Sequence, residues 1–329
     1  MIEMNLKNLD IPVLSYLSEE YPITREELSY RLSLSRAEVE KQIQQLKQLG
    51  YSISINDQKS YRIISRPDIL LPFEIKNKLT TRYIGQTIYY FPALTSTNII
   101  ARQKILRKTD NIPEGTIIIT EQQSGGKGRL GKTWFSPAGG IWLSIILYPE
   151  IISSSIALIT LMAAVVVANT ISKLFQIKAQ IKWPNDILID DRKVCGILTE
   201  MSTEAKSKQW VIVGIGINTN NDSSELPEDI RKCSISLKEV TGQLIPRVML
   251  VRHLCTEWEK FYEILKRKDF SLILEEWKLY NNIIGKRIRL DTGERIIAGE
   301  AINISDGGAL IIKTDDGKTM EIISGTVLK

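Results

Sequence analysis

The chain has 329 residues, of which 43% are hydrophobic and 25% are charged, which excludes a disordered or fibrous protein and predicts two or three globular domains. A single histidine, His253, excludes histidine-rich metal centres, and three scattered cysteines argue against a disulfide framework and favour reduced thiols in the cytoplasm. Residues 1–66 contain nine basic and nine acidic residues, and residues 281–329 contain seven of each. The net charge of +5 therefore lies in residues 67–280. This excess of basic residues either suits an anionic ligand or belongs to an ordinary solvated surface.

The N-terminal segment lacks the basic and apolar regions of a signal peptide, so we expect no export. A first helix is expected over residues 11–20. Two capping boxes follow, Thr24 with Glu27 and Ser35 with Glu38, and each predicts the start of a short helix. The spacing of the two boxes is typical of a helix-turn-helix.

A β-hairpin is predicted after these helices. The second helix ends at Gly50, and YSISI and SYRII then flank the polar turn NDQK. Helices followed by such a hairpin indicate a winged helix-turn-helix domain over residues 1–66, which binds DNA or, alternatively, another protein. Zero net charge over the segment weakens the case for DNA, whereas the helix-turn-helix spacing favours it. The candidate DNA-binding residues on the second helix are Ser35, Arg36, Glu40, Lys41 and Gln44.

Residues 66–79 contain two prolines and are expected to link this domain to a larger core. The core then alternates strand-like and helical segments, and short turns such as DDRK predict a mixed α/β sheet instead of a purely parallel one. The expected strands are TIYYF, GTIIIT, GIWLSIIL, AQIKW, DILID, VCGILTEM and WVIVGIGIN, and TNIIARQKIL is an expected helix.

One charge-free segment, between Glu150 and Lys173, is long enough to span a membrane. Several serine, threonine and asparagine residues interrupt it. Its apolar centre, residues 156–168, therefore fits a helix buried in a globular core better than a membrane span.

Residues 126–133, GKGRLGKT, match the P-loop pattern GxxxxGK[ST] letter for letter. A P-loop also requires a helix that begins at its lysine and threonine. Here WFSPAGG follows, and its proline and glycines exclude a helix at Lys132. We therefore expect a glycine loop whose cations, Lys127, Arg129 and Lys132, fold over a phosphate or carboxylate, although such loops also occur as exposed turns.

Three more segments carry polar residues at positions suited to a ligand. TSTN opens a helix, where hydroxyl and N–H groups either meet a small polar ligand or cap the helix. KWPND places a carboxylate after a strand break, and DRKVCGI begins a strand with a lysine beside a glycine. The residues concerned are Ser96, Thr97, Asn185, Asp186, Lys193 and Gly196.

The ordered motifs are STN at 96–98, QSGGKGRLGKTWFSP at 123–137, KWPND at 182–186, DRKVCGIL at 191–198 and GIGIN at 214–218. Together they resemble the biotin-protein ligases, and the resemblance covers residues 67–329. The winged helix in front is similar to that of the bifunctional ligases, which also repress the biotin operon. The resemblance implies a multidomain α/β protein with a ligase core over residues 67–282 and an SH3-like β-barrel over residues 283–329.

The C-terminal domain is also visible in the pattern itself. After a helix-rich span over residues 247–282, the sequence changes to short strands, KRIRL, RIIAGEAINI, ALIIKT and TMEII, separated by DTGE, SDGG and DDGK turns. This pattern predicts a small antiparallel β-domain.

The resemblance implies two chemical steps. Biotin and MgATP give biotinyl-5′-AMP and pyrophosphate, and a lysine of the biotin carrier domain of acetyl-CoA carboxylase then attacks the mixed anhydride. It also implies a cytoplasmic repressor that dimerises on adenylate binding and then binds operator DNA. The implied catalytic residues are Lys193, Arg129 and Asp186. The implied biotin-binding residues are Ser96, Thr97, Asn98, Gln123, Lys127, Gly128, Arg129, Lys193 and Gly196. The implied ATP- and adenylate-binding residues are Lys127, Arg129, Trp134, Asn185 and Asn218.

Two departures from the family pattern bear on adenylate retention. The basic loop of the family usually reads GRGR, whereas here it reads GKGR, and Lys127 lacks the planar fork of arginine. Related ligases commonly end in a strand with an adenylate-binding arginine, whereas here only Lys329 is available. Two other interpretations stay open: a lipoate-protein ligase of related fold, and a DNA-binding regulator that senses its ligand without ligase activity.

Overall fold

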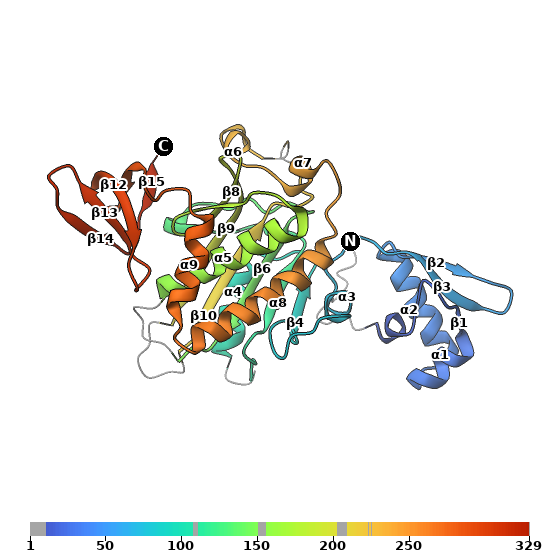
Figure 1. The fold of residues 1–329 in the computed structure, drawn as a ribbon. Coiled ribbons are helices and arrows are strands. Elements are labelled where there is room, and N and C mark those ends of the chain that lie inside the picture. Colours follow the sequence, from blue (N-terminus) through green and yellow to red (C-terminus); the bar gives the residue numbers. More distant parts are fainter. Residues whose placement is uncertain are drawn as a thin grey trace.

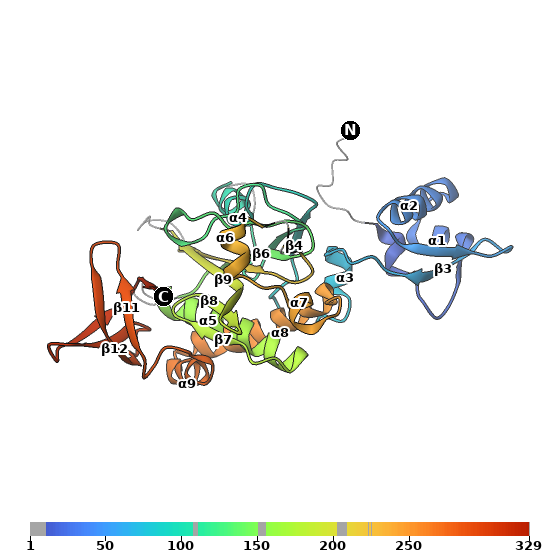
Figure 2. The same ribbon diagram turned by 90° about the horizontal axis from the view of Figure 1, so that it is seen from above.

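The computed structural model describes residues 11–107, 111–150, 156–202, 209–222, 224 and 226–328. It places three bodies in a row: N-terminal helices with a hairpin, a central sheet between helices, and a C-terminal sheet (Figures 1 and 2). One cluster of buried apolar side chains includes members from all three bodies, so they pack on one another.

Both helices of the N-terminal body begin where their capping residues predict, but only the second capping box is complete, because the Glu27 carboxylate accepts from Arg31 Nη2 at 2.6 Å instead. In α2 the Ser35 hydroxyl accepts from the Glu38 N–H while the Glu38 carboxylate accepts from the Ser35 N–H, and in α1 Thr24 Oγ1 accepts from the Glu27 N–H. The three strands form an antiparallel sheet in the order β1-β3-β2. The elements are η1 (Pro12–Ser15), β1 (Ile23–Thr24), α1 (Arg25–Leu32), α2 (Arg36–Gln48), β2 (Ser52–Ile55) and β3 (Ser60–Ser65).

The helix expected over residues 11–20 is wrong, because only the 3₁₀ turn η1 forms there. Beyond η1 the segment continues as turns and bends, and it is held to neighbouring segments by hydrogen bonds. The Val13 N–H donates to Gln42 Oε1 at 3.1 Å, and the carbonyl of Ser18 accepts from the Ile63 N–H at 2.9 Å.

Glu40, one of the expected DNA-contacting residues, is only partly exposed and is bonded within the N-terminal body. It follows the buried Val39 and lies against the hairpin, where its carboxylate accepts from the Tyr61 hydroxyl at 2.7 Å and pairs with Arg25 at 3.4 Å. The other four candidates on and before α2, Ser35, Arg36, Lys41 and Gln44, are exposed.

The expected linker is in part a packed element. The short helix α3 (Pro72–Lys76) lies in it, and Leu70, Leu71 and Ile75 are buried. The Glu74 carboxylate accepts from the Tyr51 hydroxyl at 2.7 Å, which fixes the N-terminal body to the segment that follows it.

The central sheet has seven strands in the order β4-β5-β6-β10-β9-β8-β7. Only β4 and β5 pair in parallel among these strands, which confirms the expected mixed sheet. The strands are β4 (Ile88–Phe91), β5 (Ile117–Thr120), β6 (Ile141–Leu147), β7 (Gln180–Lys182), β8 (Asp186–Ile189), β9 (Arg192–Met201) and β10 (Val211–Ile217).

Helices cover both faces of this sheet. The helix α4 (Thr97–Leu106) packs on one face, and α5 (Ile156–Phe175), α8 (Arg247–Lys266) and α9 (Phe270–Tyr280) form a layer on the other, as Figure 2 shows. Among the described residues α5 is the one helix long and apolar enough to cross a membrane, but 72% of its most apolar window is buried inside the protein. This agrees with the expected core helix.

The C-terminal sheet is antiparallel, with the order β14-β13-β12-β11-β15. It rests on α5 through Gly308, where an added Cβ would lie 3.2 Å from the Leu161 side chain. The sequence patterns did not predict its last strand. The strands are β11 (Arg287–Asp291), β12 (Ile296–Ile304), β13 (Leu310–Thr314), β14 (Thr319–Ile322) and β15 (Thr326–Leu328).

A buried guanidinium joins the connecting segment to the core. Arg247, 2% exposed, donates from Nε to Asp68 Oδ2 at 2.8 Å and from Nη1 to the carbonyl of Gly140 at 2.8 Å. Its Nη1 also lies 2.8 Å from Glu121 Oε2. Arg247 therefore balances two carboxylates from separate segments.

The variant Arg247→Met should lower the free energy of unfolding by about 3 kcal/mol, because removing one partner leaves buried polar groups and charge without compensation. Urea denaturation followed by circular dichroism measures the loss. Arg287→Met is the matched control, since its ion pair with Asp315 is more than half exposed, and we expect no measurable change. Equal losses in both variants would contradict the role of burial.

Candidate functional site

A cavity of about 510 Å³ lies over strands β9 and β10. Its walls come from the start of α4, the loop over residues 123–135, the turn between β7 and β8, the helix α6 (Glu228–Cys233) and the start of β15. The structure brings all of the predicted ligand-site residues to this one cavity. They are Ser96, Thr97, Asn98, Gln123, Lys127, Gly128, Arg129, Trp134, Asn185, Asp186, Lys193, Gly196 and Asn218.

One part of the cavity wall is strongly cationic. Five basic side chains and two carboxylates line the cavity, so the wall carries an excess of positive charge. Such an excess favours a ligand with more than one negative charge. The basic residues are Lys127, Arg129, Lys132, Lys182 and Lys193, and the carboxylates are Asp186 and Asp229.

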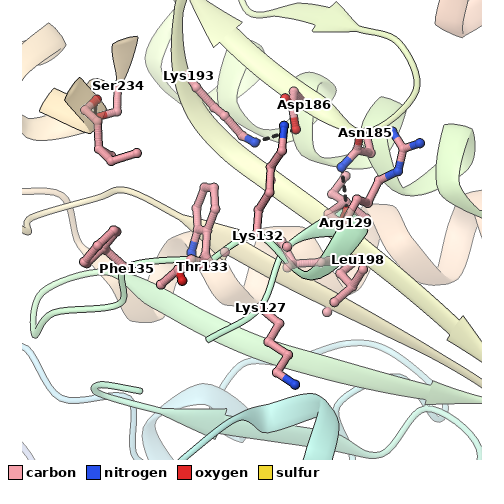
Figure 3. A pocket seen from close by; sticks show the side chains of 18 of the residues that line it. Lys127, Arg129, Lys132, Thr133, Phe135, Asn185, Asp186, Lys193, Leu198 and Ser234 are labelled. Carbon is pink, nitrogen blue, oxygen red and sulfur yellow. Dashed lines mark hydrogen bonds and ion pairs between the residues drawn. The ribbon is translucent and has the colours of Figure 1, made fainter. Parts of the chain in front are cut away.

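Arg129 connects the glycine loop to two other walls. Its Nη1 donates to Asn185 Oδ1 at 2.9 Å, and its Nη2 donates to Ser324 Oγ at 2.8 Å and to the carbonyl of Gly325 at 3.2 Å. Figure 3 shows the guanidinium turned toward Asn185. Burial lowers the pKa of Arg129, and the nearby Asp186 carboxylate opposes that shift.

Lys193 and Asp186 form an ion pair inside the cavity, with Nζ 2.7 Å from Oδ1. The Lys193 ammonium also lies 4.9 Å from the centre of the Trp134 ring. Figure 3 shows Lys132 reaching toward the same carboxylate, whereas Lys127 points away from it. An incoming anion can therefore replace Asp186 as the partner of a cation that is already in place.

Another part of the wall is polar without formal charge. The Thr97 N–H donates to Gln123 Oε1 at 2.8 Å, and Gln123 Nε2 donates to Ser136 Oγ at 2.8 Å. Ser96 precedes α4, but its side chain makes no capping hydrogen bond. The amide of Asn98 faces protein groups, Ser144 on one side and Glu200 on the other.

Glycines make room for Trp134 on the sheet. Gly196 and Gly216 are cross-strand partners on β9 and β10, and added Cβ atoms would lie 2.8 Å and 2.4 Å from the indole. An added Cβ on Gly214 would lie 2.4 Å from Asn98 Oδ1. Side chains at these three positions would collide with the groups that form the floor of the cavity.

The glycine loop is not a P-loop, as its sequence predicts. Arg129–Gly131 forms a single 3₁₀ turn, Lys132 is extended with φ −62° and ψ 142°, and no helix begins there. His253 is exposed on α8 and does not line the cavity.

The sequence patterns missed two walls of the cavity. One is the apolar wall of Leu226, Pro227 and Ile230 in and before α6, and the other is the segment of residues 325–327. Neither carries a motif, and only the fold brings them to the cavity. Lys329, the one basic residue available at the position of the family's terminal arginine, lies outside the described residues.

Comparisons with known proteins give a consistent result. Residues 90–218 match the biotin/lipoate A/B protein ligase family, and residues 283–329 match the biotin protein ligase C-terminal domain. The chain is 35% identical to the bifunctional ligase/repressor BirA of Bacillus subtilis, over 93% of this chain and 94% of that protein. It is 29% identical to BirA of Escherichia coli, over 88% of each chain.

A solved structure shares the fold of most of the chain. It is the biotin protein ligase of Aquifex aeolicus in complex with biotin and ATP, with a TM-score of 0.64 and 28% identity. The match covers 74% of this chain and 98% of that one.

The variant Gly216→Ala should push the Trp134 indole off the sheet, because the new Cβ would lie 2.4 Å from its Nε1. Trp134 is the most exposed of the six tryptophans, the other five being 8% exposed or less, so quenching of fluorescence by acrylamide reports mainly on this residue. We expect stronger quenching than in the wild type. Gly307→Ala, where the nearest atom is 3.9 Å away, is the control, and identical quenching in the two variants would refute the prediction.

Proposed function

The chain belongs to the biotin protein ligase family, and from this premise we propose that it activates biotin with ATP and transfers it to a protein lysine. The product of the first step is biotinyl-5′-AMP, and the acceptor is the biotin carrier domain of a carboxylase, acetyl-CoA carboxylase. The observation that carries the proposal is a single cavity in which five cations and a neutral polar wall meet.

The first step joins two anions, and its main obstacle is their repulsion. An oxygen of the biotin carboxylate attacks the α-phosphorus of ATP, the bond to the β-phosphate breaks, and pyrophosphate leaves. We assign Lys193 to the biotin carboxylate, and Lys127 and Arg129 to the phosphates, where fixed positive charge stabilises the developing negative charge. Mg²⁺ enters with ATP, whose phosphates supply the oxygen ligands it prefers.

The ion pair of Lys193 with Asp186 suits both steps. When the biotin carboxylate takes over Lys193, Asp186 loses its partner at 2.7 Å and becomes free to accept from another donor. In the second step the acceptor amine attacks the acyl carbon and AMP leaves, so Asp186 is placed to orient that amine. Trp134 covers the adenylate, and Asn185 and Asn218 help to hold it.

The neutral wall favours biotin over lipoate as the substrate. Ser96, Thr97 and Gln123 present hydrogen-bonding groups, which match the ureido ring of biotin and have no partner on a dithiolane. A buried polar site discriminates strongly against a ligand that leaves its groups unpaired. Lipoate-protein ligase activity is the second candidate function, since the matching family model also includes such enzymes.

Biotin should support the exchange of labelled pyrophosphate into ATP, whereas lipoate should not. The variant Lys193→Ala should slow this exchange at least about a hundredfold, because it removes a cation from the reacting carboxylate. Lys313→Ala, an exposed lysine of the C-terminal sheet, is the control and should leave the rate unchanged. Exchange with lipoate alone, or with neither acid, would overturn the proposal.

We also propose that residues 1–66 form a winged helix-turn-helix domain and that the protein is a cytoplasmic, biotin-responsive repressor. The proposal is supported by the relatives named ligase/repressor and by the exposed polar side chains of Ser35, Arg36, Lys41 and Gln44. Operators of such proteins have two-fold symmetry, which a homodimer formed on adenylate binding would match. Residues 67–282 are then the ligase core and residues 283–329 the SH3-like domain.

Operator DNA from upstream of biotin genes should shift in a gel when the protein, biotin and ATP are all present. Removing biotin should weaken the shift. Lys41→Ala should reduce DNA binding about tenfold while pyrophosphate exchange stays normal, because Lys41 is exposed on α2 and far from the cavity. If the protein catalyses pyrophosphate exchange but shifts operator DNA under none of these conditions, it is a ligase without repressor activity.

A further inference from the structure

A chain of hydrogen bonds lies beneath the neutral wall of the cavity. Its centre is Ser144 on β6, which is fully buried and does not line the cavity. The Ser144 Oγ lies 2.7 Å from Thr97 Oγ1 and 2.5 Å from Asn98 Oδ1. Ser144 therefore holds the first two residues of α4 from below.

The amide of Asn98 is fully engaged by protein groups. Its Oδ1 accepts from Ser144, and its Nδ2 donates to Glu200 Oε2 at 2.7 Å and to the carbonyl of Leu198 at 3.4 Å. The two groups near Nδ2 are pure acceptors, so the amide has one orientation that satisfies every partner. Asn98 is a spacer between α4 and the sheet, and its amide hydrogens are not available to a ligand.

Glu200 binds α4 at two points on one face. Asn98 and Arg102 lie one helical turn apart, and both contact the carboxylate of Glu200, which projects from β9. Arg102 is 44% exposed and Glu200 is 29% exposed, so the pair lies at the edge of the protein while Asn98 lies inside. Glu200 therefore sets where the helix begins relative to the sheet.

The start of α4 in turn orients Gln123. The Thr97 N–H donates to Gln123 Oε1, which directs Gln123 Nε2 to Ser136 Oγ. The donors and acceptors on this wall consequently have a fixed arrangement. That arrangement depends on Ser144 and Glu200, which do not line the cavity.

We propose that Ser144 and Glu200 are positioning residues that fix the hydrogen-bonding polarity of the wall that recognises the ureido ring. This inference rests on the proposed biotin substrate. Ser144 orients the Asn98 amide, Glu200 fixes α4, and together they place Thr97 and Gln123 so that a carbonyl acceptor and N–H donors are each met by the complementary group.

The test uses 2-iminobiotin, whose protonated guanidinium group presents N–H donors in place of the ureido carbonyl. Pyrophosphate exchange is measured with biotin and with 2-iminobiotin in the full-length wild type, Ser144→Ala and Glu200→Gln. Both variants should raise KM for biotin about tenfold, because a buried group loses its partner, and should leave KM for ATP within about twofold. They should also lower the preference for biotin, measured as the ratio of kcat/KM for biotin to kcat/KM for 2-iminobiotin, about tenfold. The reason is that the wall can then present donors where acceptors belong, or acceptors where donors belong.

Two further variants separate positioning from general damage. Glu321→Gln removes the same charge from an exposed position on β14 and should change none of these values. Arg102→Ala removes only the exposed half of the Glu200 contact, so it keeps the fold and should lower the preference by about twofold to threefold.

Equal changes in KM for biotin and ATP, or an unchanged preference in folded variants, would overturn the inference. If Ser144→Ala does not fold, an unchanged preference in Arg102→Ala and Glu200→Gln overturns it as well. Absence of biotin-dependent exchange in the wild type would instead be a failure of the proposed function.

Discussion

Close contact between side chains and a glycine strip is the constraint on which the site depends. Trp134 and Asn98 rest directly on Gly216 and Gly214, with no room for a Cβ. Trp134 ends the cationic loop, since its N–H donates to the Gly126 carbonyl at 2.9 Å, and Asn98 begins α4. The charged wall and the neutral wall of the cavity are therefore both positioned by contact with the same stretch of β10. A shift of one wall relative to the other would misplace the two ends of a ligand that spans them.

Electrostatics then explains why the cavity is stable before a ligand enters it. Five cations face two carboxylates, but the chain limits the repulsion by pairing Lys193 with Asp186 and by directing Arg129 to the neutral oxygens of Asn185, Ser324 and Gly325. Neutral acceptors stabilise a guanidinium without cancelling its charge. Lys193 and Arg129 therefore keep charge that a phosphate or carboxylate can use, and a ligand that binds them exchanges partners, so no new charge has to be desolvated.

Much of this was predictable from the sequence, and the failures have physical causes. Motifs located the cavity residues because glycines, cations and a strand break carry local signals, and the proline and glycines after Lys132 were enough to exclude a P-loop. The contacts of Glu40 with Tyr61 and Arg25 were not predictable, because helical periodicity does not show that a hairpin would fold back onto this residue. The walls at residues 226–230 and 325–327 were missed since their side chains are ordinary, and only tertiary contacts bring them to the site. Ser144 was missed for the same reason: within a strand it looks like any other small residue.

Only a few hydrogen bonds separate the segment that carries the N-terminal body from the residues of the cavity. Asp68 accepts from Asn220 Nδ2 at 2.9 Å, and the Leu70 N–H donates to Glu121 Oε1 at 2.8 Å. Asn220 and Glu121 each lie two residues from a cavity residue, Asn218 and Gln123. The segment that carries the N-terminal body is therefore hydrogen-bonded directly to the two segments that lead into the cavity. Coupling between the cavity and the N-terminal body would require an element with two arrangements that both sites bias, and these hydrogen bonds are the physical connection through which such an element would act.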